Sequence, residues 1–269
     1  MHYIKFKHDL IIGKCNICPN EGALSWDHVP PKGGYFPTKM EMNNVLGALS
    51  AKDEYKKYQE TQNGVKFRTI CRDCNSKLNK LYDKEINKFA NSLGKFLRSN
   101  LILPPVIEYE VKPVKIMKGI LGHLLSVKLE NLDTPFDNQI RDIIFSSNKR
   151  ISNDIHIFYW IYPYQNVVIL RDFGMTKYRN GNLRDVAFFQ LLKYPPVAYL
   201  ITDASSYQGL PELTQFRDLD DDKEIKMMIN LKNIHPVDWP EVVDSMNMLF
   251  LGNSAVNSVF AKPKSKVIK

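Results

Sequence analysis

The sequence has no long apolar run, and its 269 residues contain only four cysteines. No stretch approaches the about 20 apolar residues that a membrane-spanning helix needs. The N-terminal segment MHYIKFKHDL lacks the continuous apolar segment of a secretory signal, and the chain has neither internal repeats nor long low-complexity tracts. With 44% hydrophobic and 25% charged residues, we expect a soluble, cytoplasmic protein with no membrane partner.

Positive charge is concentrated in the first third of the chain. Residues 1–100 hold 17 lysines and arginines against 10 acidic residues, whereas residues 101–269 hold 20 against 19. A basic segment beside a neutral one indicates that the first third binds a polyanion such as a nucleic acid. A solvated surface with extra lysines explains the charge equally well.

All four cysteines also lie in the first third, as two pairs with two residues between their members. Cys15 and Cys18 form CNIC, and Cys71 and Cys74 form CRDC, while residues 101–269 contain no cysteine. The cytosol disfavours disulfides, and paired Cys-x-x-Cys motifs suit tetrahedral Zn²⁺. We therefore predict a closed structural zinc site with no open position for chemistry.

Hydrophobic patterning and turn residues predict an α+β protein of two domains, 1–103 and 104–269, divided near Pro104-Pro105. In the first domain we expect strands over 3–12, 23–29 and 65–70, helix and loop over 38–60, and a helix from Cys74 to near Ser99. In the second we expect strands over 106–111, 155–162, 167–173, 187–192 and 197–202. Residues 114–129 read as a helix or long apolar segment, 136–146 as a helix, and the acidic run 218–222 as a solvated loop before a helix.

An Asp-His pair stands between the two cysteine motifs, in DHVPPKG, and an asparagine follows the second motif at once, in CRDCNSKL. This order resembles the HNH endonucleases, also called ββα-metal or His-Me finger nucleases. The closest variety is braced by a four-cysteine zinc, is treble-clef-like, and occurs in bacterial phage-defence proteins. The resemblance covers roughly residues 10–98.

The resemblance implies that His28 is the general base and that Asp27 and Asn75 hold a catalytic Mg²⁺ or Mn²⁺. These residue types fit the reaction, because phosphodiester hydrolysis needs a base for water and a cation for the phosphate. Histidine accepts a proton near neutral pH, and carboxylate and amide oxygens are hard ligands. The family resemblance also implies products with 3′-hydroxyl and 5′-phosphate ends.

Two features of the motif need an explanation. Neighbouring strand residues point to opposite faces, so Asp27 and His28 converge only if the strand ends there, and we expect the Val29-Pro30-Pro31 break to end it. The family's central asparagine normally lies five residues before the second cysteine pair, where this chain has Lys66. Asn63, Asn43-Asn44 or a backbone carbonyl is left to steady the histidine.

Three lysines flank the motif, and we predict that Lys32, Lys77 and Lys80 contact phosphate. Trp26 reads as a core residue rather than a base-stacking platform. The other histidines lack partners at ligand spacing and read as structural or surface residues: His2, His8, His123, His156 and His235.

The sequence thus predicts a metal-dependent HNH endonuclease acting on double-stranded DNA, and the resemblance suggests a regulated anti-phage effector. We expect residues 104–269 to control it through a nucleotide signal, a protein partner or homo-oligomerisation. The alternative is a non-catalytic, zinc-stabilised DNA-binding or scaffolding protein.

Overall fold

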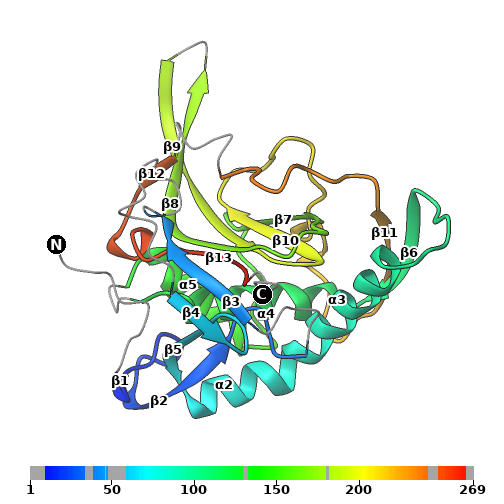
Figure 1. Ribbon diagram of the computed structural model, residues 1–269. Helices are drawn as coiled ribbons and strands as arrows, with labels where there is room; N and C mark the ends of the chain where they lie inside the picture. The colour runs from blue at the N-terminus through cyan, green and yellow to red at the C-terminus, as the bar shows by residue number, and fades with distance from the viewer. Residues whose placement is uncertain are drawn as a thin grey trace, which may run out of the picture.

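The computed structural model describes residues 10–33, 39–45, 47, 59–129, 133–179, 182–241 and 248–264. The chain is α+β, as the sequence predicts, and its named strands form three antiparallel sheets (Figure 1). No helix in the described residues is both long and apolar enough to cross a membrane.

A small sheet carries the first cysteine pair and the Asp-His pair. Its order is β1 (Ile12–Lys14), β2 (Glu21–His28), β5 (Lys66–Cys71). A register shift between Ser25 and Trp26 interrupts the pairing of β2 with β5, and beyond it Trp26 lies opposite Arg68 and His28 opposite Lys66. The expected strands over 23–29 and 65–70 are therefore confirmed. Residues 3–9 of the expected first strand lie outside the described residues.

A long helical segment follows β5 directly. It consists of α2 (Arg72–Leu78), a π-helical turn η2 (Asn79–Asp83) and α3 (Lys84–Leu97). The Cys71 sulfur caps its start by accepting the backbone N–H of Cys74. Apolar side chains at three- and four-residue steps are buried along one face, which confirms the predicted helix: Leu78, Tyr82, Ile86, Phe89 and Leu93.

The largest sheet has the order β4-β3-β13-β8-β9-β10-β7, with β12 paired to β8. Its first two strands come from the segment between the Asp-His pair and the second cysteine pair, and its third is the last strand within the described residues. The strands are β3 (Lys39–Asn44), β4 (Gln59–Gln62), β7 (His156–Ile161), β8 (Val167–Arg179), β9 (Asn182–Lys193), β10 (Val197–Thr202), β12 (Met248–Phe250) and β13 (Val259–Pro263).

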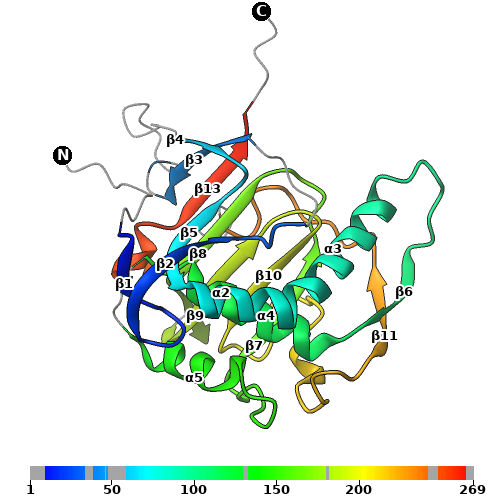
Figure 2. The ribbon, with the colours of Figure 1, turned by 90° about the horizontal axis from the view of Figure 1, so that it is seen from below.

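Helices α4 (Pro113–Ser126) and α5 (Pro135–Ile144) confirm the helices expected near these positions. Helix α4 is buried along nearly its whole length, beside the α2–α3 segment (Figure 2). A third, two-stranded sheet pairs β6 (Val106–Val111) with β11 (Ile225–Asn230). Short 3₁₀ turns occupy Thr214–Phe216 and Asn253–Ala255.

Two expectations are corrected. Within the expected helix-and-loop segment 38–60, residues 39–44 and 59–60 belong to strands β3 and β4. Met40 and Met42 alternate with polar neighbours and are buried where β3 pairs with β13. Residues 46 and 48–58 lie outside the described residues. The acidic run is a loop, as expected, but it leads into β11 rather than a helix.

The two predicted domains contact each other across the boundary at residue 103. Strand β3 pairs with β13, and a single buried cluster contains Leu78 and Tyr82 together with Ile120 and Leu124 of α4. Two domains divided at this point would therefore be packed through a common core, and the boundary itself stays a prediction.

Candidate metal centre and histidine site

The four cysteines converge, although 53 residues separate Cys18 from Cys71. Their four sulfur atoms lie within 4.8 Å of one another, and the sulfurs of Cys18 and Cys71 are 3.8 Å apart. Zinc bound tetrahedrally at about 2.3 Å from each sulfur places neighbouring sulfurs about 3.8 Å apart. The cluster therefore fits a structural Zn²⁺. A zinc ion there would connect the segment between β1 and β2 to the end of β5 and the start of α2.

Backbone donors prepare these thiols for a metal. The N–H groups of Ile17 and Cys71 donate to the Cys15 sulfur over 3.4 and 3.3 Å, and the Cys74 N–H donates to the Cys71 sulfur over 3.5 Å. The hydrogen bond from the Cys74 side chain, helped by backbone donors and opposed by burial, lowers the pKa of Cys15 to about 4. Thiolate is the form that binds metal.

Asp27 faces the interior and is paired with a residue outside the predicted motif. Its side chain is 3% exposed, and its Oδ2 lies 2.9 Å from Nδ1 of His123 on α4. The other ring nitrogen, Nε2, lies 2.9 Å from Oδ1 of Asp83 in η2. Burial lowers the pKa of His123, but the two carboxylates outweigh it and raise the pKa to about 10. An imidazolium therefore links β2, η2 and α4.

His28 is the last residue of β2 and points away from Asp27 in the alternation of the strand. It is partly exposed. The strand thus continues through His28, rather than ending early enough for the two neighbouring side chains to converge. Burial and the charges of Lys32 and Lys66 lower the pKa of His28, while Asp27 and a hydrogen bond from the ring to the backbone of Asn63 oppose the shift. Of the alternatives for steadying this histidine, the structure places the backbone of Asn63 beside it.

Asn75 is tied directly to the strand that carries His28. Its Nδ2 donates to the carbonyl oxygen of Trp26 over 2.8 Å and to the hydroxyl of Ser25 over 3.1 Å. Both acceptors lie at the register shift in β2. No hydrogen bond from the described residues reaches the Asn75 Oδ1, so this oxygen is available to a ligand.

A basic and aromatic face surrounds His28. Trp26 and His28 lie two residues apart on β2, opposite Arg68 and Lys66 on β5. The Arg68 guanidinium lies over the Trp26 ring, 4.4 Å from its centroid, and the Lys66 ammonium lies 5.0 Å from the same centroid. We call these four side chains the hairpin face. Trp26 is only partly buried, contrary to the expectation of a core residue.

The other predicted contact residues are spread more widely. Lys32 is exposed and acts on His28 through its charge. Lys77 and Lys80 are exposed on the helical segment, where the Lys77 ammonium lies 5.4 Å from the centroid of Phe145. Asn43 and Asn44 belong to β3, opposite Phe260 and Val259 of β13.

Sequence reasoning missed His123, Asp83, Lys66 and Arg68. No sequence spacing links His123 to Asp27, because 96 residues separate them. Lys66 and Arg68 lie in the predicted strand over 65–70, but their positions opposite His28 and Trp26 depend on the register shift after Ser25.

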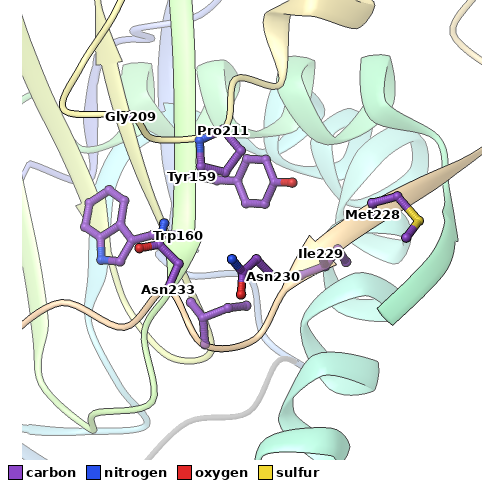
Figure 3. Close-up of a pocket in the computed structure, with 9 residues that line it drawn as sticks. Tyr159, Trp160, Gly209, Pro211, Met228, Ile229, Asn230 and Asn233 are labelled. Carbon is purple, nitrogen blue, oxygen red and sulfur yellow. The ribbon is translucent and has the colours of Figure 1, made fainter. Parts of the chain in front are cut away.

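A cavity of about 250 Å³ lies at the edge of β7 and is lined by residues between 159 and 233 (Figure 3). Its lining offers a tyrosine ring and two side-chain amides and includes no charged side chain, so it gives no complement to a phosphate group. The lining residues are Tyr159, Trp160, Ile161, Gly209, Pro211, Met228, Ile229, Asn230 and Asn233.

Comparison with models of protein families, with curated proteins and with solved structures found no match. The assignment of a family therefore depends on the motif and on the geometry of this site. The four-cysteine cluster that fits zinc is the part of the resemblance that the structure bears out.

Proposed function

We propose that the protein is a metal-dependent endonuclease of the HNH type that hydrolyses double-stranded DNA. The observation that carries the proposal is the hydrogen bond from Asn75 to the Trp26 carbonyl. It holds a helix-borne amide beside the strand end that presents His28, and the adjoining cysteine cluster anchors the same helix. A base and a hard oxygen ligand are thereby held on rigid elements, which catalysis of this kind requires.

In this proposal His28 takes the proton from the attacking water. Its lowered pKa keeps the ring neutral near pH 7, which is the form a general base needs. The Oδ1 atom of Asn75 would hold a Mg²⁺ or Mn²⁺ ion, which when bound neutralises charge on the phosphate. The resemblance also makes Asp27 a ligand, but Asp27 is buried and faces away from His28, so it would reach the ion only after its side chain turned outward. Asp27 has its Oδ2 oxygen fixed by His123, so its orientation is set by α4.

The chemistry of this donor set fits a hard cation. An amide oxygen and a carboxylate oxygen leave several positions for water and phosphate, as Mg²⁺ sites usually do. Among the described residues, the four cysteines are the one group of three or more His, Cys, Asp or Glu ligands within reach of a common ion. A catalytic ion would therefore depend largely on Asn75, on water and on the phosphate of the substrate.

The role of residues 104–269 follows from the same contacts. Helix α4 supplies His123 to Asp27, so any nucleotide, protein partner or second copy that shifts α4 acts on the strand carrying His28. We propose control of the nuclease by this route, in keeping with the resemblance to regulated phage-defence proteins. Such control requires the effector to bind one arrangement of α4 more tightly than another.

The test is cleavage of supercoiled plasmid by zinc-loaded protein, with Mg²⁺ or Mn²⁺ added or withheld. His28→Ala should lower the rate by about 10²- to 10⁴-fold and leave DNA affinity nearly unchanged. His156→Ala, purified identically, is the matched control, because this partly buried histidine pairs with Glu212 elsewhere. Binding of DNA without metal-dependent turnover in the wild type would favour the non-catalytic zinc protein instead.

A further inference from the structure

We infer that the hairpin face binds an unpaired nucleotide, with the base stacked on the Trp26–Arg68 pair and its phosphate beside Lys66 and Lys32. The inference deepens the proposed function by naming the part of the substrate that this face recognises. It rests on that proposal only in taking nucleic acid as the ligand.

Trp26 and Arg68 form a stack at the surface of the hairpin. Arg68 lies 4.4 Å from the Trp26 centroid and directly opposite it in the strand pairing. Indole and guanidinium both present flat faces on which nucleobases stack. Because Trp26 is only partly buried, the pair forms a platform at the protein surface, whereas Trp160 and Trp239 are 2% and 5% exposed.

The positive charge around the hairpin face has few acidic neighbours in the sequence. Residues 22–33 and 63–72 contain four cations and one acidic residue, Asp27, and Asp27 is turned inward onto His123. Within the described residues, neither Lys66 nor Arg68 forms an ion pair. A cationic surface without carboxylate partners favours a polyanion.

The spacing along the hairpin matches one nucleotide. His28 and Lys66 form the next pair along the hairpin, and residues two apart on a strand are separated by roughly 6.6 Å. A base on the Trp26–Arg68 platform thus places its sugar and phosphate toward His28 and the two lysines, where hydrolysis is proposed.

These features favour a nucleotide that has become unpaired, as at a junction or distorted site of double-stranded DNA, over a nucleotide inside a regular duplex. In a duplex the base faces are covered by their neighbours and only the edges are accessible in the grooves. A stacking platform is used when a base has left the helix, as in single strands, junctions or distorted sites. The basic residues alone would bind a duplex equally well, so Trp26 is the residue that favours an unpaired nucleotide.

The experiment measures binding without cleavage, in the absence of added divalent ion. Zinc-loaded full-length protein is titrated with a short single-stranded DNA, the same sequence as a duplex, and the same sequence as single-stranded RNA. Stacking should quench tryptophan fluorescence with either single strand and much less with the duplex, because the other two tryptophans are buried. The RNA arm shows whether the face prefers one type of unpaired strand.

Three variants separate stacking from charge. Trp26→Leu should abolish the quench and weaken single-strand binding by about 5- to 150-fold, with a smaller effect on the duplex, and Trp26→Phe should restore part of the affinity. Arg68→Lys should weaken single-strand binding but keep the salt dependence. The matched control is Arg72→Lys, at an exposed residue of α2, and it should bind as the wild type does. Zinc content and melting temperature confirm that each variant is folded.

The inference is overturned if Trp26→Leu binds single strands as tightly as the wild type, if it weakens duplex binding equally, or if no quench occurs. A protein that binds and quenches but never cleaves with metal leaves this inference standing and removes the nuclease proposal. If Trp26→Leu still cleaves DNA and binds single strands as the wild type does, this inference is removed and the nuclease proposal stands.

Discussion

The Nδ1 atom of His123 lies 2.9 Å from the Oδ2 atom of Asp27, and both side chains are buried. The contact joins the end of β2 to the last turn of α4, a helix of the predicted second domain. On its other side the same ring meets Asp83. Removing the ring would leave two carboxylates buried in an apolar core, where unpaired charge is strongly unfavourable.

The pKa of His123 predicts a specific pH dependence of stability. The folded protein raises this pKa from 6.5 to about 10, so it favours the protonated ring. The contribution to the free energy of unfolding is fully present below pH 6.5 and is lost as the pH rises toward 10. In urea unfolding, His123→Gln should lose about 3–5 kcal/mol at neutral pH, and the gap to wild type should narrow at high pH.

His156→Gln is the control for this prediction, since His156 bonds to one partly exposed carboxylate, Glu212, at 2.7 Å. It should cost less and leave the pH dependence of the wild type in place. A constant difference between wild type and His123→Gln from pH 6.5 to 10 would contradict the charged state assigned to His123.

The cysteine cluster predicts a metal requirement for folding of the small sheet. Cys74→Ser removes one of four thiolates and loosens the start of α2, where Asn75 follows. We expect about one zinc per wild-type chain, and much weaker zinc retention with a lower melting temperature in the variant. Zinc is measured by elemental analysis. Ser76→Ala, at an exposed residue two positions on, should keep both zinc and stability.

The zinc cluster was predictable from sequence because its ligands come as two local pairs with a fixed spacing. The helix after Cys74 was predictable because its apolar residues repeat at helical steps along one continuous stretch. The strand over 39–44 was not, because its partner β13 lies more than 200 residues along the chain, and the strand over 59–62 pairs in turn with β3. Local propensity does not carry information about such pairing.

The site residues likewise divide into those that a local motif identifies and those whose positions depend on distant residues. His28 and Asn75 could be named from the motif, whereas the inward direction of Asp27 depends on His123, a distant residue. Trp26 was misread because its apolar ring suggests burial. Its actual position depends on the register shift at Ser25, which places it opposite Arg68, and a shift of this kind leaves no clear mark in one sequence.

Close packing of α4 against the helical segment predicts a strong effect of a small substitution. A Cβ atom at Gly119 would lie 2.6 Å from Cδ1 of Ile86 and 2.8 Å from Cβ of Tyr82. Gly119→Ala should therefore lower the free energy of unfolding by about 1–3 kcal/mol through overpacking, although alanine favours helix more than glycine does. The matched control is Gly22→Ala, where no atom lies within 4 Å, and its unfolding midpoint in urea should stay close to that of the wild type.

The shared core makes a final prediction about the boundary at residue 103. A chain ending there lacks α4, so Asp27 and Asp83 lose His123, and buried side chains such as Leu78 and Tyr82 lose their packing partners. It also lacks β13, which pairs with β3. We expect residues 1–103 to show no cooperative thermal transition by circular dichroism, even with zinc supplied, and to expose apolar surface to a hydrophobic dye. A sharp transition with one bound zinc would show instead that the first domain folds independently, and that α4 only covers a surface already complete.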